Sequence, residues 1–142
     1  MNSSFNSKLV SRQGAARCAP TVLLIVIMVL LGGCAQAGDP GAATLKYLEA
    51  RAAADVDAIR AVSCAAWEGQ AAAQADSFRS MNARLDNVTC EPNGTSGNFT
   101  VVTCEGQIMT TYNGENRARP IPSYQLIQED GEWKVCGEAS TS

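Results

Sequence analysis

The sequence contains no histidine. Histidine is the commonest general base and the commonest nitrogen ligand of metals, so its absence excludes a Ser-His-Asp triad and a histidine-based metal centre. Glycine motifs of the G-x-G-x-x-G and G-x-x-x-x-G-K types, which bind phosphates, are absent too. Aromatic residues make up only 6% of the chain, so few large side chains are available for a core or a pocket.

Long apolar runs are also missing. The longest one, residues 22–31, has ten residues, whereas a helix that spans a membrane needs about 20. Lys8, Arg12 and Arg17 precede this run, and no acidic residue does. A basic start followed by a short apolar run is typical of a secretory signal peptide.

The four residues Leu31-Gly32-Gly33-Cys34 resemble the lipobox of bacterial lipoproteins. The resemblance implies removal of a signal peptide of residues 1–33 and attachment of lipid, including palmitate-like acyl chains, to Cys34. Two or three acyl chains would anchor the protein to the outer face of the plasma membrane or in the outer membrane. The alternative is a plain secretory signal that is cut nearby, with Cys34 incidental.

The mature chain would be acidic. Without residues 1–33 it has eight basic residues against fourteen acidic ones, a net charge of −6. The basic residues are scattered, and nucleic acid is therefore not an expected partner, because phosphate contacts dominate that affinity. We expect the membrane as a partner through the lipid anchor, and no cofactor or metal.

Four cysteines remain besides the lipobox cysteine: Cys64, Cys90, Cys104 and Cys136. An even number of cysteines in a small exported domain indicates disulfides. Zinc binding is the alternative, although the chain lacks the close C-x-x-C pairs that zinc sites usually show. Four cysteines allow three pairings. We favour Cys90–Cys104 between neighbouring strands and Cys64–Cys136 between the helical half and the last strand.

The first half of the mature chain is predicted to be helical. From residue 42 onward, apolar residues recur at steps of three and four, with Arg51 on another face of the helix. Asp55 and Asp57 are expected to cap a short second helix. The alanine-rich residues 65–83 predict a third, because alanine has the highest helix propensity.

The second half is predicted to form four antiparallel strands, which cover residues 85–91, 99–112, 120–129 and 132–138. Residues 92–98 are expected to form a loop, and Gly106 a β-bulge. An Asp-Gly hairpin signal before the last strand puts Leu126 opposite Val135 on the buried face. Helices followed by an antiparallel meander predict an α+β fold, with the helices packed on a curved sheet.

Two segments resemble the nuclear-transport-factor-2-like superfamily, also called cystatin-like or SnoaL-like. "AATLKYLEARAAADVDAIRAV" resembles the opening helices of these domains, and "YQLIQEDGEWKVCG" resembles their closing hairpin. The resemblance implies a domain of residues 42–138 with a conical sheet. A lipidated cysteine and short tether, residues 34–41, would precede it, and a tail of residues 139–142 would follow. Members often bind a small apolar ligand in the mouth of the cone, while others are isomerases or dehydratases.

The sequence assigns no catalytic residue. Enzymes of this superfamily often use an Asp–His pair, which this chain cannot form, although a carboxylate beside a tyrosine stays open. A set of large side chains could line an apolar ligand pocket or simply form the core: Trp67, Phe78, Met109, Tyr124 and Trp133. Arg117 and Arg119 could bind a ligand carboxylate or could be solvated charges on an edge strand.

The function that the sequence favours is a non-catalytic binding module for a small apolar ligand or a partner protein. One alternative is an accessory subunit of a cell-envelope complex that binds no ligand. Such a subunit could form a homodimer through an exposed strand of residues 99–112. The other alternative is an isomerase- or dehydratase-like enzyme that uses a buried carboxylate and a tyrosine.

Overall fold

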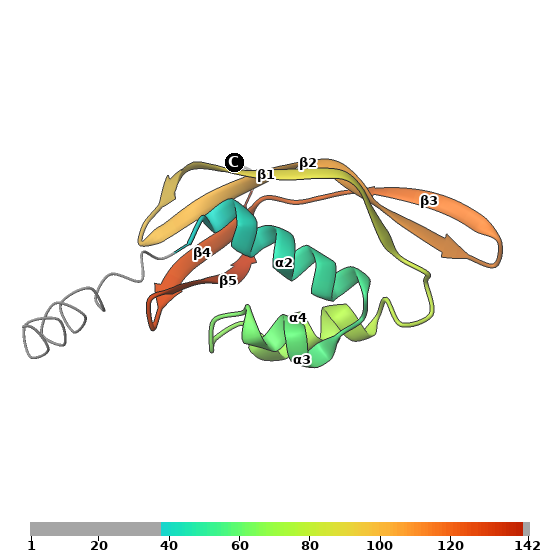
Figure 1. Cartoon of the computed structure of the whole chain (residues 1–142), viewed down its shortest axis with the longest axis horizontal. Helices are drawn as coiled ribbons and strands as arrows, with labels where there is room; N and C mark the ends of the chain where they lie inside the picture. Colours follow the sequence, from blue (N-terminus) through green and yellow to red (C-terminus); the bar gives the residue numbers. More distant parts are fainter. Residues whose placement is uncertain (1–37, 141–142) are drawn as a thin grey trace, which may run out of the picture. The chain divides into compact units, whose positions relative to one another are not determined.

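The computed structural model of this protein describes residues 38–140, so the predicted signal peptide, Cys34 and the first part of the tether lie outside the described residues. The described chain is an α+β domain, as the sequence predicts, with its helices before its strands. The helices are α2 (Pro40–Ala52), α3 (Val56–Ala61) and α4 (Glu68–Asp76). The strands are β1 (Arg84–Ser96), β2 (Phe99–Tyr112), β3 (Glu115–Pro120), β4 (Tyr124–Glu129) and β5 (Glu132–Glu138). The helices lie on one side of the sheet (Figure 1).

The first two helices begin at side-chain caps. The carboxylate of Asp39 accepts a hydrogen bond from the Ala42 amide at 2.9 Å, and a proline follows it at the first helical position, so α2 starts two residues earlier than predicted. The carboxylate of Asp55 accepts from the Ala58 amide at 3.0 Å. The predicted cap of the second helix is therefore confirmed for Asp55.

The third helix is shorter than predicted. It ends at Asp76, and the residues that follow form turns in which the Phe78 amide bonds to the Ala75 carbonyl and the Met81 amide to the Phe78 carbonyl. Asn82 then takes a positive φ of 40°, which a helix cannot contain. The expectation of a helix over residues 65–83 followed alanine propensity, and the need to turn the chain into β1 overrides it.

The sheet has five strands rather than four. The order is β1-β2-β4-β5, and β3 also pairs with β2. β3 and β4 share one edge of β2, with β3 on its Gln107–Tyr112 end and β4 on its Thr100–Val102 end. Pro120 and Pro122 carry no N–H group, so the ladder along this edge breaks between β3 and β4. The predicted strand over residues 120–129 is therefore only β4, and β3 was missed.

β2 lies in the interior of the sheet. β1 pairs with one of its edges, and β3 and β4 pair with the other. Both edges of this strand carry hydrogen bonds to neighbouring strands, so a homodimer through residues 99–112 would have to use the open face of the sheet, and it stays a prediction.

The predicted loop over residues 92–98 is mostly strand. β1 continues to Ser96, and only Gly97 and Asn98 form the turn into β2. A register shift between Pro92 and Thr95 lets the strand absorb one extra residue. Glycine, asparagine and proline in this segment therefore mark a bulged strand end and not a loop.

The predicted bulge lies opposite Gly106 and not at it, because two residues of β1, Asn87 and Val88, face the single Gly106 of β2. The pairing of β1 with β2 shifts between Asp86 and Thr89, opposite this glycine. Gly106 has a φ of +93°, and a Cβ atom there would lie 2.5 Å from the carbonyl oxygen of Asn87. The two long strands can therefore bend at this point only with a glycine in place.

The structure contains both disulfides in the pairing that the sequence favours. Cys90–Cys104 joins residues that lie directly opposite each other on β1 and β2. Cys64–Cys136 joins the segment before α4 to β5. Beside this second disulfide, Ser63 pairs in parallel with Val135, so the edge of β5 is covered by the connection between α3 and α4.

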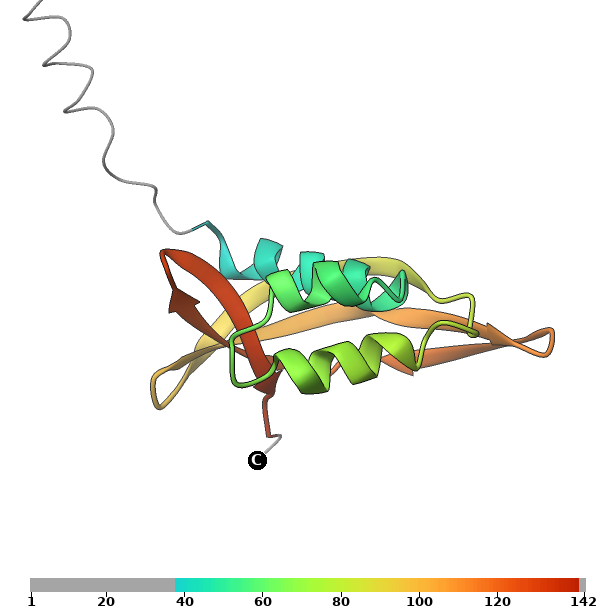
Figure 2. The same cartoon turned by 90° about the horizontal axis from the view of Figure 1, so that it is seen from below.

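The core lies between α2, α4 and the sheet. Its fully buried members include Tyr47, Leu48, Ile59, Val102, Tyr124, Leu126 and Val135. Leu126 pairs with Val135 across β4 and β5, as the hairpin register predicts. In Figure 2, which looks from below, α2 and α4 lie across the long strands, and β4 and β5 stand at one end of them.

Candidate functional site

Arg51 occupies the last turn of α2, one helical turn after the fully buried Tyr47. Residues four apart lie on the same face of a helix. The side chain of Arg51 is only 15% exposed, so the prediction that it lies on another face of the helix is wrong. The i+4 spacing from Tyr47 was the signal in the sequence that could have placed it correctly.

Arg51 contacts three side chains from distant parts of the chain. Its Nη1 donates a hydrogen bond to the hydroxyl oxygen of Tyr124 at 3.0 Å and lies 3.6 Å from a carboxylate oxygen of Glu138. Its guanidinium carbon lies 5.2 Å from the centre of the Phe78 ring, a distance at which a cation is attracted to an aromatic face. Its Nε is buried and has no hydrogen-bond partner among the described residues.

A hollow of about 420 Å³ opens beside Arg51, at the point where β3 gives way to β4. This volume is within the usual range of small-molecule sites. Apolar side chains form most of its wall, and the charged groups on it are two arginines and one glutamate. The lining residues are Arg51, Phe78, Ile108, Arg119, Pro120, Ile121, Pro122 and Glu138.

A second set of polar contacts lies behind this hollow. The indole N–H of Trp67 donates to the hydroxyl oxygen of Tyr47 at 3.1 Å, and that hydroxyl donates to the Gln74 side-chain oxygen at 3.3 Å. The rings of Tyr47 and Tyr124 pack at a tilt, with their centres 5.3 Å apart. Each buried polar end is therefore paired, which removes most of the cost of burying it.

Burial raises the pKa of both Tyr47 and Tyr124, more than Arg51 lowers it. The unfolded chain loses these protons near the ordinary value of about 10, while the folded protein keeps them. The free energy of unfolding is therefore independent of these groups below that pH and decreases as the pH rises above it. Both hydroxyl groups stay protonated at neutral pH and can donate hydrogen bonds.

This pKa shift predicts the result of an alkaline titration. We expect Tyr112→Phe protein, which keeps only the two buried tyrosines of the described chain, to show tyrosinate absorbance only when its circular dichroism reports unfolding. The substitution removes the one exposed tyrosine, so its signal does not obscure the others. Full ionisation of both tyrosines while the protein remains folded would contradict the buried positions.

The structure brings together some of the predicted ligand-binding residues. Phe78 lines the hollow, and Tyr124 accepts a hydrogen bond from Arg51 on its wall, whereas Trp67 bonds to Tyr47 and is not part of the lining. Trp133 packs against the core from β5 and is not part of the lining. Met109 is half-buried and follows the inward-facing Ile108 on β2, so its side chain is on the other face of the sheet.

Sequence reasoning missed three residues of the lining that carry its chemistry or shape. These are Arg51, Ile108 and Glu138. Arg51 and Glu138 are 87 positions apart along the chain, and no local pattern could have brought them together. Arg119 was considered for a ligand carboxylate, and the structure places it on the hollow, whereas Arg117 forms an ion pair with Glu115 at 3.1 Å.

One cluster has the composition of a metal site. The sulfur atoms of Cys64 and Cys136 and a carboxylate oxygen of Glu129 lie within 4.8 Å of one another. The two sulfurs are joined in a disulfide, so they do not supply the thiolates that bind metals.

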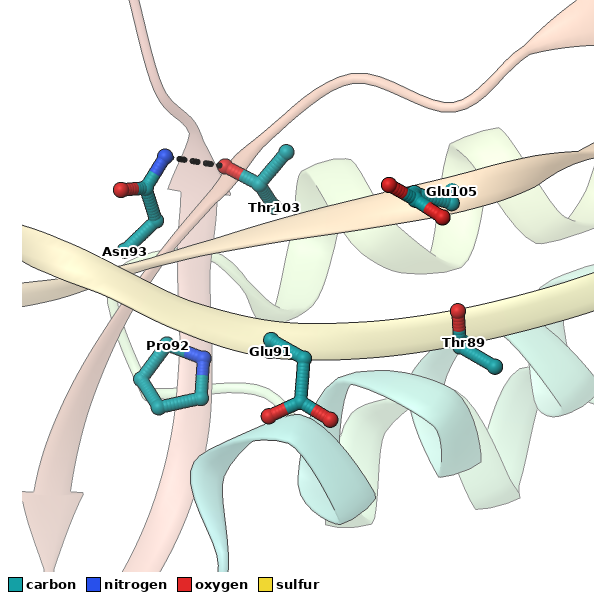
Figure 3. Close-up of a pocket in the computed structure, with 6 residues that line it drawn as sticks. All are labelled: Thr89, Glu91, Pro92, Asn93, Thr103 and Glu105. Atoms are coloured by element: carbon teal, nitrogen blue, oxygen red, sulfur yellow. Dashed lines mark hydrogen bonds between the residues drawn. The ribbon is translucent and has the colours of Figure 1, made fainter.

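A second hollow, of about 410 Å³, lies on β1 and β2 (Figure 3). The residues that line it are mostly of polar types: Thr89, Glu91, Asn93, Thr103 and Glu105, beside Pro92. The Asn93 amide donates to the Thr103 hydroxyl at 3.2 Å. Thr89 pairs with Glu105, and Glu91 pairs with Thr103, on either side of the core-facing Cys90–Cys104 pair. Because side chains alternate along a strand, these four residues lie on the face of the sheet that is turned away from the helices.

Within residues 38–140, the tyrosine hydroxyls at the first hollow bond to an arginine, a tryptophan and a glutamine, and no carboxylate is hydrogen-bonded to them. Among the same residues, no helix has the length and apolar character needed to cross a bilayer. Comparison of the chain with protein-family models, with curated proteins and with solved structures finds no match.

Proposed function

We propose that this protein is an exported bacterial lipoprotein whose domain binds a small, largely apolar ligand without catalysis. The signal-like residues 1–33 and the lipobox ending at Cys34 support export and lipid attachment. The membrane anchor and the cell-envelope location follow from these residues. The domain would then lie close to the membrane surface, because α2 begins at Pro40 and only residues 34–39 separate it from the lipid.

We also propose that the domain has the nuclear-transport-factor-2-like architecture. The helices α2, α3 and α4 precede an open antiparallel sheet, and the last two strands form a hairpin with an Asp-Gly turn. These features support the resemblance of the opening and closing segments. In this architecture the ligand enters between the helices and the sheet, and the lining of the hollow, which includes Arg51 of α2 and Ile108 of β2, supports the proposal.

A single observation carries the binding function: a hollow of ligand size, with five apolar residues in its lining, has a largely buried arginine in its wall. Withdrawing a charged side chain from water costs free energy unless partners hold it, and a ligand that contacts the arginine would give this arrangement a use. Tyrosine, glutamate and phenylalanine side chains hold this arginine in place from three different elements.

Mass spectrometry of the full chain, expressed in a bacterium and extracted from its membranes, tests both parts of the proposal. Under denaturing conditions we expect the mass of residues 34–142 plus acyl chains. Under native conditions we expect an additional mass that leaves on organic extraction. Cys34→Ala should remove the acyl mass, whereas Cys18→Ala should leave it unchanged, because Cys18 is in the segment that is cut off.

The possible results separate the proposals. Acyl chains on the Cys34→Ala protein would contradict the lipobox. A native spectrum that contains only the bare lipidated chain, or its dimer, at every protein concentration would contradict ligand binding and favour an accessory subunit that binds other proteins.

A further inference from the structure

The charge of the hollow beside Arg51 is opposite to the charge of the domain. Two arginines and one glutamate are the charged residues on its wall, whereas the chain from Cys34 onward has a net charge of −6. Apolar walls strengthen electrostatic interactions, because they exclude the water that would screen them. The hollow therefore favours an anionic group over a neutral or cationic one.

The two arginines are incompletely paired. Arg51 faces Glu138 at 3.6 Å, but the Glu138 side chain is 41% exposed, and the Nε of Arg51 has no acceptor among the described residues. A buried donor without an acceptor is destabilising, and a ligand oxygen that reaches it would remove that cost.

Arg119 differs from its neighbour on the same strand. Residues 117 and 119 share one face of β3, because side chains alternate along a strand. Arg117 bonds to Glu115 at 3.1 Å, whereas Arg119 forms no ion pair within the described part of the chain. Arg119 lines the hollow and is exposed, so a ligand in the hollow can reach its guanidinium group.

We propose that the ligand is a small apolar molecule with a carboxylate, which Arg119 and Arg51 bind while the apolar part contacts Phe78. The inference rests on the proposed binding function and adds the chemical class of the ligand. A guanidinium donates two parallel hydrogen bonds to a carboxylate, a geometry that a neutral amide cannot match. Isoleucines and prolines at the β3–β4 break give the apolar part its wall.

Two probes of nearly equal size test whether the hollow recognises a carboxylate. They are 2-naphthoate and 2-naphthamide, in which a neutral amide replaces the carboxylate. Calorimetric titration uses the full lipidated chain in lipid nanodiscs, with empty nanodiscs as a blank. We expect naphthoate to bind about ten times more tightly than naphthamide, because a charge-assisted hydrogen bond is stronger than a neutral one. Arg119→Gln should weaken naphthoate binding by about tenfold and leave naphthamide binding unchanged.

Arg117→Gln is the matched control, because it removes the same charge from the same face of β3 outside the hollow. It should bind both probes like the wild type. Equal affinity for the two probes, or equal losses in the Arg117 and Arg119 variants, would overturn the carboxylate assignment and leave the binding function standing. Binding of neither probe would overturn the carboxylate assignment together with the function on which it rests.

Discussion

Replacing Cys64 and Cys136 together by alanine is expected to lower the free energy of unfolding by about 4 kcal/mol. The two cysteines are 72 positions apart, so their disulfide closes a long loop in the unfolded chain. In the loop-entropy model, the stabilisation increases with the logarithm of loop length and reaches about 4 kcal/mol for a loop of this size. The loss is a large share of the stability of a small domain, which is typically about 5–15 kcal/mol.

Removal of the other disulfide is the control for this prediction. Cys90 and Cys104 are 14 positions apart, and the same model gives about 3 kcal/mol for a loop of that length. Urea unfolding without reductant, followed by circular dichroism, measures both variants. A larger loss for the Cys90–Cys104 pair would show that loop length does not determine the contribution of these disulfides.

Gly106→Ala is expected to lower the free energy of unfolding by about 3 kcal/mol. The substitution forces an alanine into a left-handed backbone conformation, which costs about 1–2 kcal/mol. Its Cβ atom would also lie 2.5 Å from the Asn87 carbonyl oxygen, and relieving that overlap costs about 1–3 kcal/mol more. Neither the carbonyl nor the bulged strand can move without breaking the pairing of β1 with β2.

Gly94→Ala separates the cost of the backbone conformation from the cost of the Cβ overlap. Urea unfolding measures the loss of stability in both variants. Gly94 has nearly the same φ, +89°, but a Cβ atom there would meet nothing within 4 Å. We expect it to cost only the backbone term, about 1 kcal/mol. Equal losses at the two glycines would mean that the close approach to Asn87 contributes nothing.

The sequence predicted those features of the fold that depend on local chemistry. The Asp55 cap and the register of the Leu126–Val135 hairpin each follow from a few neighbouring residues, and the structure contains both. Gly106 does mark an irregular point of the sheet, but the extra residue of the bulge is on β1 opposite it. The favoured disulfide pairing also holds, because Cys90 and Cys104 lie on strands that are adjacent in sequence.

The errors arise where distant contacts override local preference. Alanine propensity extended the third helix beyond Asp76, where the chain must turn to enter the sheet. β3 was missed because Glu115–Pro120 is exposed along its whole length and shows no apolar alternation. The pairing of this strand depends on β2, which a scan of its own residues cannot detect.

The candidate site was predicted only in part for the same reason. Its apolar side could be anticipated from large residues such as Phe78. Its charged side combines Arg51 at the end of α2 with Glu138 at the end of β5. These two residues are far apart in the sequence and come together only in the folded domain. An arginine in an alanine-rich helix is most often a solvated residue, so composition alone gave no reason to bury it.

The positions of the two disulfides also fix the order in which this domain can mature. If the chain is exported, as we propose, its amino-terminal end emerges first, and the hairpin of β1 and β2 can oxidise as soon as Cys104 emerges. Cys64 must wait for Cys136, which lies six residues before the end of the given sequence. During that interval Cys64 is a free thiol beside an already available Cys90 and Cys104. Correct pairing therefore depends on the early closure of the hairpin, which removes both wrong partners before the right one arrives.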